Sequence, residues 1–471
     1  VKSALSNCGY DYPDGKVVVN LAPVDLAKEG ARFDLAIAVS ILRATGQLTE
    51  PDGTGAVELL GELSLTGELR GVRGSLCAAL NLEEESHLIV PRANAAEALM
   101  AGNRVIALSH LKEVVRFLEG EEPGNFRSLR VRNDPIEITE PPVVVGQANA
   151  KRALTVAATG GHHLLMVGPP GTGKSMLAQQ LPHLLPPMTA REAMEVAAIR
   201  SAAGLSASAA GLSASAAGLR ASAAPWSTPL TRPVRSPHHS VSATAMTGGG
   251  SHPRPGEVSL AHNGVLFLDE LPHFKPSVLD SLREPLETRE ISIARTAGTA
   301  HFPAGFQLLA AMNPCPAGLV CGEGRCRCRP DQRQRYQSRV SGPLLDRIDL
   351  HVPVSEVPNH LLLEEASDPW DPEAVRQQVS RARERQIDRQ GCTNARLPGA
   401  ALLKICALGA AEKRLLDRAS DRYRLSARGL HRVLKVARSI ADLAGSDRVQ
   451  ADQLAEALSF RAMDWSGTSG A

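Results

Sequence analysis

The sequence has few aromatic residues, little net charge and no long apolar run. Phe, Trp and Tyr make up only 3% of its 471 residues, so aliphatic side chains must fill the hydrophobic cores. The formal net charge of +2 excludes a strong field over the whole molecule, and contact with nucleic acid needs a local basic patch. No apolar run approaches the roughly 18 residues of a membrane span, and no secretory signal opens the chain. We therefore expect a cytoplasmic protein without a membrane partner.

The eight cysteines fall into two groups. Four stand alone, as the reduced thiols of cytosolic proteins usually do: Cys8, Cys77, Cys392 and Cys406. The other four lie within fourteen residues of one another: Cys315, Cys321, Cys326 and Cys328. Four thiolates at short spacing suit a tetrahedral Zn²⁺ site, although the spacing is not that of common zinc ribbons. The cluster indicates either zinc binding or free thiols, with redox activity as a lesser alternative.

A chain of this length is too long for one hydrophobic core, so we expect several domains. In residues 1–120, short apolar runs alternate with glycine turns and helical patterns, which predicts a compact α/β domain. Its expected strands are 17–21 and 58–65, and its expected helices are 34–45 and 74–82. Residues 121–141 are rich in Pro, Gly and charge, as linkers are.

Residues 142–365 alternate buried-strand patterns with helical ones, which predicts a parallel sheet with helices on both faces. The expected strands are 163–167, 265–268 and 307–312, and the first expected helix is 176–185. Residues 204–224 repeat a seven-residue unit of Gly, Leu, Ser and Ala, and we interpret them as an expanded surface loop or weak helix. Residues 366–471 have a helical pattern and predict a small helical domain.

One stretch has the full pattern of a phosphate-binding loop. Gly168-Pro-Pro-Gly-Thr-Gly-Lys-Ser175 matches G-x-x-x-x-G-K-[ST], and it follows an apolar strand and begins a helix, as the motif requires. Backbone N–H groups of such a loop surround phosphates, and the helix N-terminus adds positive charge. Lys174 would reach the β- and γ-phosphates, and Ser175 would offer its hydroxyl to Mg²⁺. The motif predicts ATP binding by Gly168, Pro169, Pro170, Gly171, Thr172, Gly173, Lys174 and Ser175.

Polar side chains follow the next two expected strands. The apolar run Val265–Leu268 ends in Asp269 and Glu270, and paired carboxylates at the end of a buried strand are costly without a purpose. Asp269 would hold Mg²⁺, and Glu270 would polarise the attacking water. Asn313 can orient water against the γ-phosphate, although a turn residue ahead of a proline is the alternative. Together with the loop, these residues predict ATP hydrolysis.

Longer stretches carry a family resemblance: Val145–Leu154, the phosphate-binding loop, Pro237–His239, Gly248–Glu270, Met312–Pro316 and Ser341–Leu350. In these stretches the chain resembles the Mg-chelatase-like ComM/YifB family of AAA+ ATPases. The resemblance implies an α/β protein with three parts. They are an N-terminal domain similar to the Lon protease domain at 1–120, an AAA+ core at 142–365 and a C-terminal helical lid at 366–471.

The resemblance also implies how the protein works. Arg347 is the expected arginine finger, which reaches the nucleotide of a neighbouring subunit, and Arg428 is the expected second sensor on the lid; a surface salt bridge is the alternative for each. A finger that acts on a neighbour requires a ring, and the family implies a homohexamer. It implies a helicase that drives branch migration during natural transformation, on single-stranded or branched DNA and without sequence specificity. Candidates to contact DNA in the ring are Arg254, His252, His238 and His239.

Two other functions fit parts of the sequence. A magnesium-chelatase-like ATPase that remodels a protein or cofactor complex has a similar core and is the main alternative. A Lon-type peptidase needs a Ser nucleophile activated by a Lys. Here Lys28-Glu-Gly30 is followed by Ala31–Asp34, and residues 68–82 contain no lysine. We therefore expect the N-terminal domain, which we take to be incomplete at its start, to be proteolytically inactive.

Overall fold

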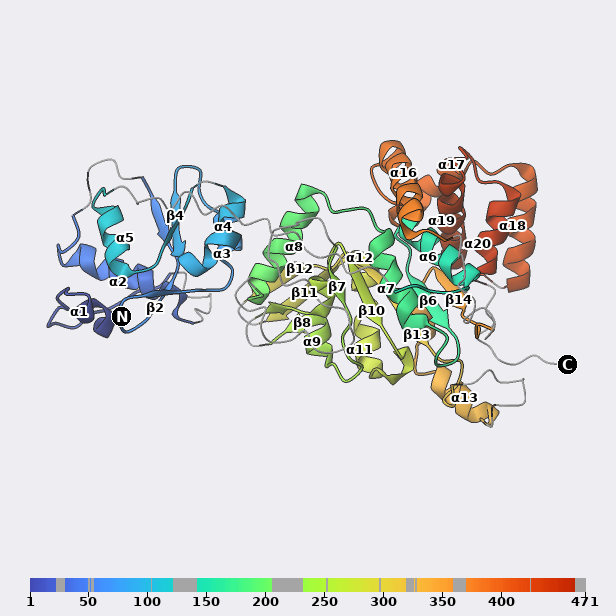
Figure 1. Ribbon diagram of the computed structural model, residues 1–471, viewed down its shortest axis with the longest axis horizontal. Helices are drawn as coiled ribbons and strands as arrows, with labels where there is room; N and C mark the ends of the chain where they lie inside the picture. The colour runs from blue at the N-terminus through green and yellow to red at the C-terminus, as the bar shows by residue number, and fades with distance from the viewer. Residues whose placement is uncertain are drawn as a thin grey trace.

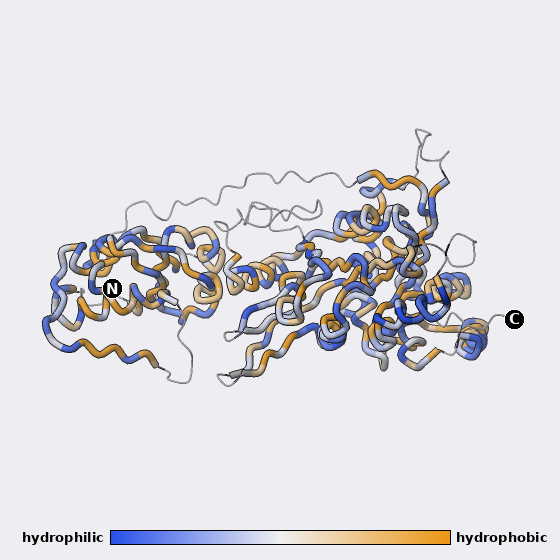
Figure 2. Tube along the Cα trace, turned by 90° about the horizontal axis from the view of Figure 1, so that it is seen from below, coloured by the Kyte–Doolittle hydropathy of each residue, from blue (hydrophilic) through white to orange (hydrophobic). Residues whose placement is uncertain are grey.

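The computed structural model describes residues 1–22, 30–49, 51, 55–102, 104–121, 142–205, 232–250, 253–295, 298–318, 326, 328–358, 370–423 and 425–461. The expected linker from residue 122 on and the repeat from residue 206 on lie outside the described residues. Figure 1 shows an N-terminal α/β unit, an α/β core and a C-terminal helical bundle. Figure 2 shows the N-terminal unit and the core as two lobes along the longest axis, with hydrophobic and hydrophilic residues alternating along their helices.

The N-terminal unit is built around a three-stranded parallel sheet in the order β1-β4-β5. Its strands are β1 Val57–Leu59, β2 Glu62–Leu63, β3 Leu69–Arg70, β4 His87–Pro91 and β5 Val105–Leu108. Its α-helices are α1 Lys2–Asn7, α2 Asp34–Ala44, α3 Ser75–Leu80, α4 Ala95–Ala98 and α5 Leu111–Leu118, and its 3₁₀ helices are η1 Ala31–Phe33, η2 Arg92–Asn94 and η3 Leu99–Ala101. The two helices expected in this unit are confirmed, with ends that differ by one or two residues.

Both strand predictions for this unit need correction. The run 17–21 is not a strand: Val18 is 76% exposed, whereas Val17 packs against the hydrophobic core of this unit. The run 58–65 is divided between β1 and β2, which belong to different sheets. The division falls at Gly61, whose N–H donates to the carbonyl oxygen of Arg32 at 2.9 Å. Apolar alternation alone does not reveal a backbone that leaves one sheet for another.

The core contains a five-stranded sheet in the order β14-β6-β13-β10-β7, and every neighbouring pair is parallel. Its strands are β6 Leu164–Val167, β7 Val234–Arg235, β10 Val265–Leu268, β13 Gln307–Met312 and β14 Leu350–Pro353. The strands expected at 265–268 and 307–312 are confirmed to the residue. Two hairpins extend the core, β8 Gly248–Gly249 with β9 Arg254–Pro255 and β11 Glu290–Arg295 with β12 Gly298–Pro303.

Helices cover both faces of this sheet, as its three fully buried central strands, β6, β13 and β10, require. Alternate strand residues belong to two hydrophobic cores, with Leu164 and Phe267 in one core and Leu165 and Leu266 in the other. The helices of the core are α6 Ala148–Gly160, α7 Lys174–Leu184, α8 Ala190–Ala203, α9 Ala243–Thr247, α10 Glu257–Leu260, α11 Pro276–Ser281, α12 Pro285–Thr288, α13 Pro330–Gln337 and α14 Gly342–Leu345, with the 3₁₀ helix η6 Leu271–His273.

The C-terminal bundle shares one of these two cores. Its helices are α16 Pro372–Gln390, α17 Gly399–Cys406, α18 Ala410–Tyr423, α19 Ala427–Leu443 and α20 Ala451–Ser459, with the 3₁₀ helix η7 Asn394–Arg396. Val433 and Ile440 of α19 pack in the same core as Leu154 of α6 and Leu164 of β6. The bundle is therefore joined to one face of the sheet by a continuous apolar contact.

A buried ion-pair network organises this bundle. Arg438 is completely buried, and its guanidinium donates to Oδ1 of Asp442 at 2.9 and 3.2 Å. The same carboxylate accepts from Arg389 at 2.7 and 3.0 Å and from Asn394 at 2.8 Å. One acid thus compensates two cations and joins α16, η7 and α19.

Changing Asp442 to asparagine is expected to destabilise the bundle by about 3–5 kcal/mol, because the buried Arg438 then has no compensating charge. Urea unfolding followed by circular dichroism measures the effect. Asp417→Asn, at an exposed position of α18, is the matched control and should change the free energy of unfolding by less than about 0.5 kcal/mol. Equal stability of the two variants would contradict the role given to this network.

The N-terminal unit docks on α8 of the core. Glu97 is 4% exposed, and its Oε1 accepts from the hydroxyl of Ser75 and from that of Ser201, the latter at 3.2 Å. Ser201 belongs to α8, and its carbonyl oxygen accepts from the N–H of Gly74 at 3.0 Å.

None of the helices in the described part of the chain combines the length and apolar character needed to cross a membrane.

Candidate nucleotide site

The predicted site residues lie where three neighbouring strands of the core sheet end. β6, β13 and β10 are adjacent and parallel, so their carboxyl ends meet at one edge of the sheet. Gly168 follows β6, Asn313 follows β13 and Asp269 follows β10. Open parallel sheets bind ligands outside this edge. The fold thus brings together side chains up to 139 residues apart in the chain.

The loop 168–175 keeps its backbone accessible to phosphates. Gly171 and Gly173 have φ angles of 77° and 83°, in the left-handed region that favours glycine. No described atom lies within 4 Å of a Cβ built on either residue. At Gly168, by contrast, a Cβ would lie 2.1 Å from the carbonyl oxygen of Val354, which excludes other residues. The helix α7 begins at Lys174 with its N-terminus at the loop, so the whole segment fits a polyphosphate.

Lys174 connects this loop to the residue that follows β13. Its Nζ donates to the carbonyl oxygens of Gly168 at 2.8 Å and Pro169 at 2.6 Å, and to Oδ1 of Asn313 at 3.2 Å. Burial lowers the pKa of the Lys174 ammonium, and this effect outweighs the opposite effect of the carboxylates of Asp269 and Glu270. A cation therefore lies at the point where the loop, Asn313 and the acids meet.

Ser175 and Asp269 form a pair of oxygen ligands. The hydroxyl of Ser175 donates to Oδ2 of Asp269 at 2.8 Å, and Oδ1 of Asp269 accepts from the N–H of Glu270 at 2.9 Å. Mg²⁺ prefers hard oxygen ligands and usually binds through one or two protein groups together with substrate phosphates. The two side chains fit this ion in chemical type and in their position beside the loop.

Glu270 is held by histidines in a strained backbone position. Its φ of 51° lies in the left-handed region, which costs free energy in a residue other than glycine and is typical of functional sites. Its Oε2 lies 3.0 Å from Nδ1 of His273 and 3.7 Å from Nδ1 of His239. The ring of His238 lies 4.0 Å from that of His239, centroid to centroid. The structure thus places the histidine pair, a candidate for contact with DNA, beside Glu270.

Three further residues at the site had no role in the sequence analysis. Gln147 has a left-handed φ of 55°, and its Nε2 donates to the carbonyl oxygens of Thr172 at 3.2 Å and Ser355 at 2.6 Å. His273 is the second, and Tyr336 is the third. Burial raises the pKa of Tyr336 to about 12, and the nearby backbone of Asn313 opposes this shift. A spacing of three from Glu270 was the only sequence signal for His273, and the Val-Gly-Gln stretch was the only one for Gln147.

Arg347, which follows α14 of the core, and Arg428, on α19 of the bundle, meet at Glu287 of the core. Both approach Oε1 of Glu287, Arg347 at 2.6 Å and Arg428 at 3.8 Å. Arg347 also donates to the carbonyl oxygen of Pro343 at 2.7 Å, while its buried Nε has no hydrogen-bond partner in the described structure. The two arginines line a pocket of about 590 Å³. Other charged residues that line it are Arg283, Asp346 and Arg461.

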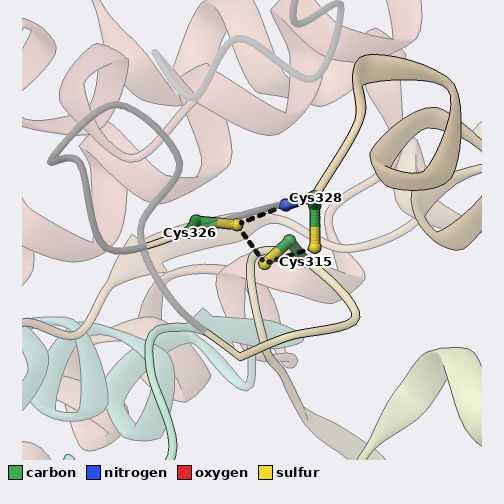
Figure 3. A group of neighbouring side chains, drawn as sticks. All are labelled: Cys315, Cys326 and Cys328. Atoms are coloured by element: carbon green, nitrogen blue, oxygen red, sulfur yellow. Dashed lines mark hydrogen bonds between the residues drawn. The ribbon is translucent and has the colours of Figure 1, made fainter.

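The structure brings three cysteines of the cluster together (Figure 3). Cys315, Cys326 and Cys328 direct their sulfur atoms toward one another, all within 4.8 Å. Cys321 lies outside the described residues, as does His252. Arg254 lies on β9 and is exposed.

Family descriptions of magnesium chelatase match most of the chain. "Magnesium chelatase, subunit ChlI" matches residues 142–362, its C-terminal counterpart matches residues 370–461, and "Subunit ChlI of Mg-chelatase" matches residues 1–94. These three ranges correspond to the core, the helical bundle and most of the N-terminal unit.

Relatives named YifB and ComM are similar to this chain along almost its whole length. "Uncharacterized protein YifB" of Salmonella typhimurium is 44% identical over 466 residues, which cover 98% of this chain and 88% of the relative. "Competence protein ComM" of Haemophilus influenzae is 43% identical over 473 residues, which cover 98% of this chain and 89% of the relative. "Lon protease 2" of Bacillus subtilis is 27% identical over 150 residues, 31% of this chain and 25% of its own length. With the nucleotide-site residues gathered on a parallel sheet and this similarity along almost its whole length, the chain belongs to the Mg-chelatase-like ComM/YifB family of AAA+ ATPases.

Proposed function

We propose that this chain is an ATP-hydrolysing motor that acts on DNA as a homohexameric ring and promotes branch migration in recombination and DNA uptake. The observation that carries the motor is the convergence of Lys174, Ser175, Asp269, Glu270 and Asn313 at one sheet edge. DNA is proposed as the substrate because the chain is similar, along almost its whole length, to a relative named as a competence protein.

The side chains divide the work of hydrolysis. The N–H groups of Gly171 and Gly173 and the ammonium of Lys174 bind the phosphates of ATP. Ser175 and Asp269 hold Mg²⁺, which when bound neutralises charge on the β- and γ-phosphates. Glu270 orients and polarises the attacking water, while His273 fixes its carboxylate.

Asn313 is the remaining polar group at the γ-phosphate position. Its Oδ1 accepts from Lys174, so its amide N–H groups remain available to a phosphate oxygen or to the attacking water. Positioning of this kind supplies much of the rate in phosphoryl transfer, because the protein contributes little covalent chemistry.

Arg347 and Arg428 support the ring. Both form ion pairs with Glu287 rather than contacting the phosphate-binding loop of their own chain. Among the described residues, the buried Nε of Arg347 has no acceptor, so this N–H group is available to one from a neighbouring subunit. In a ring, the pocket that these arginines line would face the γ-phosphate of the neighbouring subunit, where a guanidinium stabilises transition-state charge.

The cofactors of the proposed motor are ATP with Mg²⁺. For DNA, the two hairpins of the core supply a surface away from the nucleotide site. They lie side by side, because a Cβ on Gly248 of β8 would meet Cδ1 of Ile293 on β11 at 3.2 Å. Non-sequence-specific binding through backbone phosphates fits a chain with local rather than overall positive charge.

The second candidate is an ATPase that remodels a protein or cofactor complex, as magnesium chelatase does. The family descriptions that match the core and the bundle favour it. Both candidates share the nucleotide chemistry and differ in the substrate of the motor.

A four-way DNA junction with one labelled strand separates the two candidates. We expect ATP-dependent conversion of the junction to duplex products, and none with Glu270→Gln or with a non-hydrolysable ATP analogue. The measurement is gel separation of the products, beside the rate of phosphate release and the oligomeric state from light scattering. A hexamer that hydrolyses ATP and leaves the junction intact would reject the helicase and favour the remodeller.

A further inference from the structure

The three cysteine sulfurs have the spacing of a tetrahedral metal site. Sγ of Cys315 lies 3.5 Å from Sγ of Cys326 and 3.8 Å from Sγ of Cys328. Ligands at the Zn–S distance of about 2.3 Å, arranged tetrahedrally, lie about 3.8 Å from one another. The sulfurs of a disulfide lie about 2.05 Å apart. The observed spacing therefore fits three ligands of one zinc ion (Figure 3).

This group of thiols is connected to the nucleotide site through Asn313. Cys315 follows Asn313 by two residues, and its carbonyl oxygen accepts from the N–H of Gly318 at 2.9 Å. Gly318 in turn lies against the phosphate-binding loop, since a Cβ on it would be 2.9 Å from Cδ of Pro170. A turn anchored at Cys315 therefore holds the end of β13 against the loop.

The same thiols are connected to α13, which begins at Pro330, two residues after Cys328. The far end of α13 returns to the site. The ring of Tyr336 lies 6.2 Å from that of His273, centroid to centroid. Gln337 donates to the carbonyl oxygen of Pro314 at 3.1 Å. In Figure 1, α13 otherwise projects from the core.

We propose that Cys315, Cys326 and Cys328 bind a structural Zn²⁺ that fixes α13 to the end of β13 and so positions Asn313 and Glu270 for ATP hydrolysis. The positioning part rests on the proposed function, whereas zinc binding does not. The ion would tie Cys328, two residues before the start of α13, to Cys315 at the end of β13. At its far end, α13 holds the same strand end through the hydrogen bond from Gln337 to the carbonyl oxygen of Pro314.

Zinc content is the first test. We expect about one zinc per chain in protein purified without added metal. Cys326→Ser and Cys328→Ser should lower the content about 10-fold or more, and Cys392→Ser, at an isolated cysteine, should leave it unchanged. Cobalt exchanged into the site should show a thiolate charge-transfer band. Absence of zinc, an iron–sulfur chromophore in its place, or a disulfide among these cysteines would overturn the proposal.

The second test separates positioning from folding, and it uses the wild-type chain. A chelator that strips zinc should lower kcat for ATP hydrolysis by about 10- to 100-fold, with ATP binding unchanged, and added zinc should restore it. Zinc loss without a change in kcat would overturn the positioning role. A chain that binds zinc but never hydrolyses ATP would instead reject the proposed function.

Discussion

Replacing Glu270 with glutamine is expected to lower kcat for ATP hydrolysis by about 10²- to 10⁴-fold, while the affinity for ATP remains within about threefold. Glutamine keeps the size of the side chain and its hydrogen bonds but has no negative charge to polarise water. The contacts of Lys174 and the glycine backbone, which bind the phosphates, are unaffected by this change.

Phosphate release at saturating ATP measures the rate, and fluorescence of a labelled nucleotide measures the affinity. The matched control is Glu384→Gln, the same chemical change at an exposed position of α16, which should hydrolyse ATP at the wild-type rate. Loss of affinity together with rate would indicate that Glu270 supports the loop rather than the water. A variant with more than about half of the wild-type rate would reject the assignment of the base.

The core strands were predictable because their sequence pattern is local. A run of four apolar residues between a glycine and two acids specifies β10 without reference to the rest of the chain, and the six-residue run of β13 does the same. Parallel strands that end in polar residues then place those residues at one edge. The meeting of Asp269 with Ser175 follows from this rule, although they are 94 residues apart.

Contacts that depend on how loops and the helical bundle pack on the sheet were not predictable. His239 reaches Glu270 because the segment after β7 lies beside η6, and no periodicity encodes that approach. Arg347 and Arg428 meet on Glu287 only once the bundle has packed on the core. The prediction of a strand at 17–21 was wrong for a related reason. A strand needs a partner strand, which its own residues do not specify.

Arg347→Ala is expected to lower kcat by about 10³- to 10⁵-fold, because the guanidinium acts on the transition-state charge. If it acts on the neighbouring subunit, activity should return when two inactive variants are mixed. A Glu270→Gln subunit keeps its arginine, and an Arg347→Ala subunit keeps its glutamate. Random rings assembled from equal amounts pair an intact glutamate with an intact arginine at about a quarter of their interfaces.

Recovery on mixing is therefore the decisive measurement, with phosphate release followed after the two variants are dissociated and reassembled together. Arg414→Ala, at an exposed position of α18, should be fully active alone and shows that loss of an arginine is not harmful in itself. Since Arg347 also bonds Glu287 and Pro343 within its own chain, each variant must first be shown to assemble. Assembled mixtures that stay inactive would place the action of Arg347 within one subunit, where each variant carries its own defect and no pairing can compensate for it.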